Sequence, residues 1–132
     1  MAFLIDTDIL IYSLKGDERV RENFLKHQNT PKFVSVVSYG ELLFGAKKSQ
    51  AVEKNLATVH RIAEIFPIID ISKAIIETFA GLKVELQQRG KPIDDMDLLI
   101  AATAMTMNLT LVSNNEKHFR RVHGLLFENW NQ

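Results

Sequence analysis

The stretch from Ile93 to Asn115 constrains the fold of this chain more than any other part of the sequence. It reads IDDMDLLIAATAMTMNLTLVSNN, an acidic start, a long apolar run, a turn at Asn108 and a short apolar run. Residues 98–107 are apolar all round except for two threonines, which is typical of a buried helix. Residues 109–112 are apolar except for one threonine, as in a strand of a covered sheet. The stretch therefore predicts a buried helix followed directly by a buried strand.

The single connecting residue, Asn108, means that the strand must run back antiparallel to the helix. At about 1.5 Å per helical residue and about 3.3 Å per strand residue, the two segments have similar lengths. The start of the helix should then lie beside the end of the strand. This places Asp97 and the polar residues 113–115 together at one edge of the fold.

Length and composition limit the chain to a few classes of protein. Its 132 residues are enough for one core, so we expect a single domain over residues 1–132. No apolar run is long enough for a membrane span, no secretory signal is visible, and cysteine is absent. These features fit a cytoplasmic protein without disulfides, thiolate zinc sites or cysteine nucleophiles. The sixteen basic and sixteen acidic residues cancel, so the total charge gives no argument for nucleic-acid binding.

Short apolar runs alternate with segments of helical periodicity along the chain. The expected strands are residues 2–5, 33–37, 68–71, 109–112 and 125–127. The expected helices are residues 9–12, 17–27, 38–47, 50–65, 72–90 and 98–107, with a turn or short helix at 116–121. Strands separated by helices predict an α/β fold with a parallel sheet and helices on both faces.

Four polar residues are expected to meet at the carboxyl edge of this sheet, where sites lie in open α/β folds. Asp6 directly follows the first strand. Glu41 falls in the first turn of the helix after the second strand, where Ser38 and Glu41 fit a capping box. Asp97 and Asn115 reach the same edge through the helix–strand turn.

Each acid, taken singly, also has a structural explanation. Glu41 would complete its capping box, and Asp97 would do the same with Asp94. Asp6 would cap the helix over residues 9–12. Together, however, the acids would repel one another unless a cation or a proton intervened.

Oxygen ligands without thiolates or paired histidines suit Mg²⁺ or Mn²⁺. Such a metal activates water and stabilises charge on a phosphoryl group during hydrolysis. The four histidines show no metal-ligand spacing, and we expect His118 to be a solvated loop residue. Small basic clusters at residues 47–48, 89–91 and 120–121 are weak evidence for RNA binding, because solvated surfaces account for them equally well.

Five sequence blocks cover essentially the whole chain in order. They are LIDTD at 4–8, VSYGELLFG at 37–45, PIDDMDLLIAA at 92–102, LVSNNEKHF at 111–119 and ENW at 128–130. These blocks resemble the PIN-domain family and, within it, the VapC-type toxins of bacterial toxin–antitoxin pairs. The resemblance implies a three-layer α/β/α fold with a mostly parallel sheet of about five strands. It also implies an endoribonuclease that uses Mg²⁺ or Mn²⁺ and leaves a 5′-phosphate and a 3′-hydroxyl.

The resemblance assigns roles to individual residues. Asp6 and Asp97 match the direct metal ligands, and Glu41 matches an acid that binds the metal directly or through water. Asn115 matches a fourth position that is Asp or Asn in the family. The supporting positions that match are the hydroxyls of Thr7 and Ser113, and Ser38 as the residue that steadies Glu41.

Three residues depart from the family pattern. Asp8 stands where many relatives have Asn, Asn115 is neutral where others carry an acid, and His118 replaces a frequent acid. The charge lost at Asn115 argues against tight binding of a second metal. We expect Asp8, like Asp94 and Asp95, to act mainly as a helix cap.

The resemblance further implies partners: an RNA substrate, with tRNA and other structured RNA as candidates, a VapB-type antitoxin and a second copy of the chain. Two alternatives remain open from the residues. One is a nuclease of the same fold that acts on structured DNA or flaps. The other is a non-catalytic, receiver-like adaptor that binds Mg²⁺. A receiver should carry a lysine after the strand at 109–112, where this chain has Ser-Asn-Asn.

Overall fold

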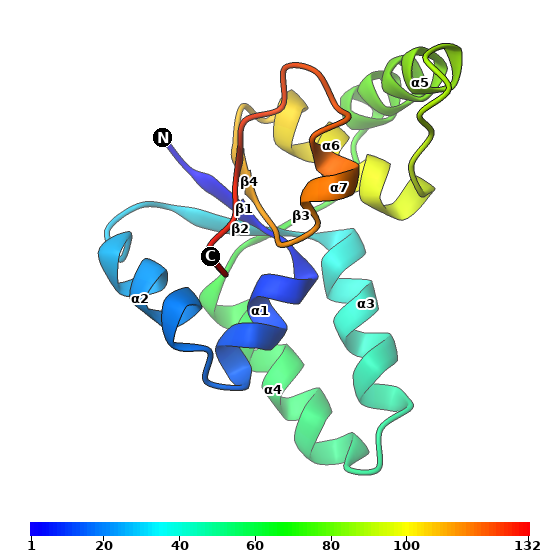
Figure 1. The fold of residues 1–132 in the computed structure, drawn as a ribbon. Helices are drawn as coiled ribbons and strands as arrows, with labels where there is room; N and C mark the ends of the chain where they lie inside the picture. Colours follow the sequence, from blue (N-terminus) through cyan, green and yellow to red (C-terminus); the bar gives the residue numbers. More distant parts are fainter.

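The computed structural model describes all residues 1–132 and shows a five-stranded sheet in which every neighbouring pair is parallel (Figure 1). The strand order is β3-β2-β1-β4-β5. The strands are β1 (Phe3–Ile5), β2 (Lys32–Ser35), β3 (Ile68–Ile69), β4 (Thr110–Val112) and β5 (Phe127–Glu128). The predicted α/β fold with a parallel sheet is confirmed.

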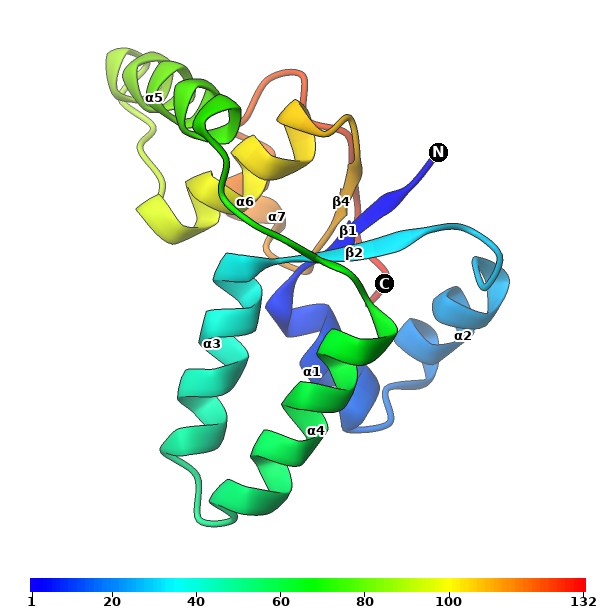
Figure 2. The ribbon, with the colours of Figure 1, turned by 180° about the vertical axis from the view of Figure 1, so that it is seen from behind.

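Helices cover both faces of the sheet and form the outer layers (Figures 1 and 2). On one face lie α1 (Thr7–Leu14), α2 (Glu18–Lys26), α3 (Val36–Lys47) and α4 (Val52–Ile65). On the other face lie α5 (Lys73–Gln88), α6 (Asp95–Thr106) and the short α7 (Glu116–Phe119). No helix has the length and apolar character that crossing a membrane would require.

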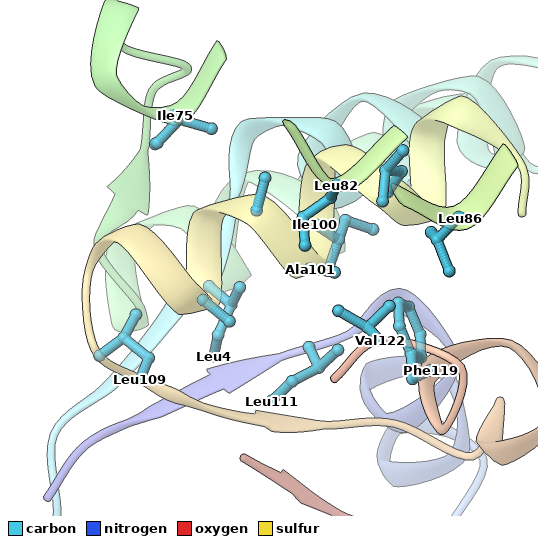
Figure 3. Close-up of a cluster of buried hydrophobic side chains, with 13 residues drawn as sticks. Leu4, Ile75, Leu82, Leu86, Ile100, Ala101, Leu109, Leu111, Phe119 and Val122 are labelled. Carbon is cyan, nitrogen blue, oxygen red and sulfur yellow. The ribbon is translucent and has the colours of Figure 1, made fainter. Parts of the chain in front are cut away.

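The central strand β1 supplies both halves of the core, because successive strand residues face opposite sides of a sheet. Phe3 and Ile5 belong to the cluster with α1–α4, whereas Leu4 belongs to the cluster with α5 and α6. All three side chains are completely buried. In the second cluster, Leu4 and Leu111 lie on the sheet and the apolar side chains of α5 and α6 cover them (Figure 3).

The turn between α6 and β4 has the geometry that the sequence predicts. Asn108 adopts a left-handed conformation with φ of 56°, which asparagine tolerates better than most residues. Leu109 N donates to Ala104 O over 2.8 Å and closes the helix. β4 then runs back beside β1, so the start of α6 and the end of β4 lie at the same edge.

The expected capping box at Ser38 is wrong. Strand β2 ends at Ser35, whose extended backbone and side chain cap α3: the Oγ of Ser35 accepts from Val37 N over 3.1 Å. Ser38 therefore lies inside the helix, and Glu41 lies beyond the first turn.

Three strand predictions also differ from the structure. The strand expected over residues 33–37 spans Lys32–Ser35. β3 contains only two residues, and β5 begins at Phe127 instead of Leu125. The register of β5 is set by pairing, with Leu111 opposite Phe127 and Val112 opposite Glu128. Local sequence could not specify this register because it depends on the neighbouring strand.

Candidate active site

Asp6 lies at the centre of a polar cluster at the carboxyl edge of the sheet. It follows β1, caps α1 and is only 6% exposed. Its Oδ1 accepts from Thr7 N over 2.8 Å, and its Oδ2 accepts from Ser113 Oγ over 2.7 Å. The Asp6 carboxylate therefore caps α1 and also belongs to the polar cluster.

Asp8 belongs to the same cluster, which the sequence analysis missed. Its Oδ1 accepts from Ile9 N over 2.7 Å, as a cap would. Its Oδ2, however, accepts from Asn114 N over 3.0 Å and from Ser113 Oγ over 3.4 Å. The position of Asp8, two residues after Asp6, was the available clue, but only the folded loop after β4 gives it partners.

Burial raises the pKa of Asp6 to about 7, and the neighbouring charge of Asp8 adds to this effect. Hydrogen bonds from Ser113 and Thr7 act in the opposite direction, and the charge of Asp97 raises the pKa further. Burial also raises the pKa of Asp8. The cluster thus crowds negative charge into a poorly solvated place, which favours a bound proton or cation.

Glu41 joins the cluster from α3. Its Oε1 accepts from Thr7 Oγ1 over 2.7 Å. Thr7 consequently contacts two acids, Asp6 through its backbone N–H and Glu41 through its hydroxyl. Ser38 makes no hydrogen bond to Glu41, and its buried Oγ has no partner.

Asp97 reaches the edge from α6, beside the loop after β4. Its Oδ2 accepts from Asn115 Nδ2 over 3.1 Å, as the antiparallel helix–strand argument predicts. The helix cap is Asp94, which accepts from Met96 N, so Asp97 is free of that role.

The prediction that His118 is a solvated loop residue is wrong. It lies on α7 with Nδ1 2.9 Å from Asp97 Oδ2, and its side chain is partly buried. His118 follows Asn115 by three residues, so one helical turn brings both toward Asp97. That spacing was visible in the sequence, but residues 116–121 were predicted as either a turn or a short helix, and the structure shows the helix.

The donor atoms in the cluster fit a hard divalent cation, because they are carboxylate, amide and hydroxyl oxygens. The crowded acids also supply the negative charge that such an ion would neutralise. In this arrangement no three acidic or histidine side chains are placed so that they could hold a metal ion together. The Glu41 and Asp97 oxygens are instead held by hydrogen bonds from Thr7, Asn115 and His118.

Two hollows border Glu41. One, of about 560 Å³, lies between α3 and the start of α6 and includes the 65% exposed Phe44. The ammonium group of Lys48 lies 4.9 Å from the centre of that ring. The other hollow, of about 480 Å³, lies between α1, α3 and α4. Glu41 is therefore approachable from both sides of α3.

Comparison with protein-family models gives a match of residues 3–125 to the PIN domain. The chain is 37% identical to ribonuclease VapC2 of Haemophilus influenzae, with 98% of each chain covered. It is 34% identical to the tRNA(fMet)-specific endonuclease VapC of Shigella flexneri, again with 98% of each covered.

Solved structures give the same result. The chain superposes on VapBC2 from Rickettsia felis, bound to a DNA fragment from their promoter, with a TM-score of 0.92 and 33% identity. That match covers 98% of this chain and 99% of the other. DNA-bound VapBC from Salmonella typhimurium matches with a TM-score of 0.90 and 30% identity over 98% of each chain.

Proposed function

Because this chain belongs to the PIN-domain family, we propose that it is a divalent-metal-dependent endoribonuclease and the toxin of a VapBC-type toxin–antitoxin pair. The observation that carries this proposal is the convergence of Asp6, Glu41 and Asp97 from three distant segments. Each of these acids accepts a hydrogen bond from a hydroxyl or amide group of the cluster. An isolated helix cap would need none of these long-range contacts.

The proposed ligands for Mg²⁺ or Mn²⁺ are Asp6 and Asp97, with Glu41 binding directly or through water. When bound, the ion would activate water and stabilise charge on the phosphoryl oxygens. Asn115 and His118 orient the Asp97 carboxylate, and donors on two sides fix the buried Asp6 carboxylate. These contacts would keep the acids in place before substrate arrives, because hydrogen bonds to metal ligands fix the orientation of those ligands.

The proposed substrate is RNA. Initiator tRNA is the first RNA to test, because two relatives with 34% identity, from Shigella flexneri and Salmonella typhimurium, are described as tRNA(fMet)-specific endonucleases. The exposed ring of Phe44 and the adjacent Lys48 offer a stacking surface and a positive charge beside Glu41.

The proposed protein partners are a VapB-type antitoxin and a second copy of the chain. Similarity to solved VapBC complexes supports the antitoxin. A segment of the antitoxin would lie over the acids and neutralise them with a positively charged side chain. In a homodimer, small basic clusters from two copies would frame one RNA groove despite the zero net charge of each chain.

Cleavage of RNA by the purified, antitoxin-free protein tests the function. Initiator tRNA and a total-RNA pool are incubated with Mg²⁺, Mn²⁺ or EDTA, and Asp97→Asn serves as the control because it removes charge with little change in volume. We expect discrete fragments with a metal and none with EDTA or the variant. Absence of cleavage by folded protein with either metal would contradict the proposal, and preferential cleavage of competing flap DNA would identify a DNA nuclease instead.

A further inference from the structure

We propose that Asn129 is a positioning residue of the candidate active site. It fixes the loop of residues 113–115, whose side chains and backbone hold Asp6, Asp8 and Asp97. The position of Asn129 follows from the fold alone, whereas an effect of Asn129 on metal binding rests on the proposed function.

Edge strand β5 brings Asn129 to this loop. Val112 of β4 pairs with Glu128, and Ser113 N donates to Glu128 O over 3.0 Å. This register continues with Asn129 opposite Ser113, so Asn129 lies diagonal to Asn114. The side chains of Asn129 and Asn114 reach each other across that diagonal.

The side chain of Asn114 is held at both ends of its amide. Its Oδ1 accepts from Asn129 Nδ2 over 3.0 Å, and its Nδ2 donates to Tyr12 Oη over 3.3 Å. Its backbone N–H donates to Asp8 Oδ2 over 3.0 Å. Asn129 thus holds Asn114, whose backbone N–H binds Asp8. The residues on either side of Asn114 bind Asp6 and Asp97.

The amide of Asn129 has a single favourable orientation. Its Nδ2 also donates to Glu116 Oε2 over 3.0 Å, and its Oδ1 accepts from Asn131 N over 2.9 Å. A reversed amide would place its oxygen against the carboxylate of Glu116 and the side-chain oxygen of Asn114. The orientation is therefore set by electrostatic repulsion as well as by hydrogen bonds.

The backbone that carries Asn129 is anchored on both sides. Strand pairing holds the preceding residue, and Trp130 follows with only 1% of its surface exposed. The indole stacks on His27 at 5.0 Å, and Asn23 Nδ2 donates to Trp130 O over 3.3 Å. The chain end is thus a fixed support from which Asn129 holds the loop.

The loop transmits this position to the acids. Ser113 Oγ contacts Asp6 and Asp8, and Asn115 Nδ2 contacts Asp97. Losing the donor at position 129 would free one end of the Asn114 amide and let the loop relax. We expect the acids to become less well ordered while the core remains packed.

Amide hydrogen exchange followed by NMR tests the positional claim without metal or substrate. In Asn129→Ala we expect the N–H groups of Asn114 and Asn115 to exchange about tenfold faster, which corresponds to the loss of one hydrogen bond. Exchange at Leu111 should not change. The matched control is Gln132→Ala, because Gln132 also donates to Glu116 Oε2 but makes no hydrogen bond to Asn114. Wild-type exchange rates in Asn129→Ala would overturn the proposal.

Binding of Mn²⁺ alone, measured by calorimetry, tests the consequence for the site. We expect Asn129→Ala to bind Mn²⁺ about tenfold more weakly, with Gln132→Ala equal to the wild type. Equal Mn²⁺ affinity in wild type and Asn129→Ala would overturn the positioning role at the metal site. If the wild type itself does not bind Mn²⁺, the proposed metal dependence fails, and the exchange experiment alone decides the role of Asn129.

A double variant tests the hydrogen-bond mechanism. In Asn129→Asp, the new carboxylate faces Glu116, so we expect rapid exchange of the loop. Adding Glu116→Gln supplies a donor toward position 129, while the Asn114 amide can turn and accept from the Tyr12 hydroxyl. Exchange should then return to within about threefold of the wild type. Failure of this rescue would overturn the hydrogen-bond mechanism.

Discussion

Ser113 donates its hydroxyl to Asp6 Oδ2 over 2.7 Å, although 107 positions separate the two residues in the chain. The same hydroxyl accepts from Asn115 N over 3.0 Å. One buried oxygen thus connects the ends of neighbouring strands β1 and β4. Since Asp6 is also buried, this contact stabilises a carboxylate that has little access to solvent.

Replacing Ser113 with Ala should destabilise the protein at neutral pH by about 1–3 kcal/mol, because the buried carboxylate of Asp6 loses a donor. Urea unfolding at pH 7.5 in EDTA would measure this loss. Ser49→Ala is the control, since Ser49 also makes side-chain hydrogen bonds but lies at the far end of α3. Equal losses in the two variants would contradict a special role for Ser113.

The stability of the metal-free protein should fall as the pH rises from about 4 to about 7. The pKa of Asp6 is raised from 3.8 to about 7 in the fold, so the folded protein binds more protons than the unfolded chain in this window. Asp8 contributes in the same direction, because burial raises its pKa too.

Asp6→Asn should weaken this pH dependence. Relative to the wild type, its free energy of unfolding should rise between pH 4 and pH 7 by up to about 4 kcal/mol. Urea unfolding in EDTA across this range measures the difference between the two proteins. Parallel pH profiles would show that Asp6 ionises normally in the fold.

His118→Ala should lower the rate of RNA cleavage about tenfold, because His118 orients the carboxylate of Asp97. Initial rates at saturating metal would measure the effect. His123→Ala is the matched control: its ring is 70% exposed and lies 3.7 Å from Glu85, away from the acids. Full activity in His118→Ala would mean that Asp97 needs no support from this residue.

Trp130→Ala should destabilise the fold by about 3–5 kcal/mol, because it removes a large buried side chain from the core. The indole contacts Phe3 and Phe24 edge-on, each at 5.1 Å between ring centres. Chemical unfolding with Phe44→Ala as an exposed aromatic control would test this. A comparable loss in Phe44→Ala would indicate a general effect of aromatic removal.

Local pattern was enough to predict where much of the candidate site lies. Asp6 follows an apolar strand, and Asp97 and Asn115 are brought together by a one-residue turn between a helix and a strand of similar length. That geometry predicts only that the two residues lie close together, and the structure shows Asn115 Nδ2 donating to Asp97 Oδ2 over 3.1 Å. The prediction of a capping box at Ser38 was wrong because Ser35 caps the helix instead. Ser35 has an extended backbone at the end of β2, which is the conformation that a helix cap requires.

The sequence by itself determined the alternation of strands and helices, the parallel sheet and the edge at which the acids meet, because these follow from periodicity and chain direction. Only the tertiary structure decided that Asp8 and His118 lie at the candidate site and that Asn129 contacts its loop. Those contacts depend on strand register and on side-chain direction across distant segments. Hydrogen bonds require a match within a few tenths of an ångström, which local sequence patterns do not encode.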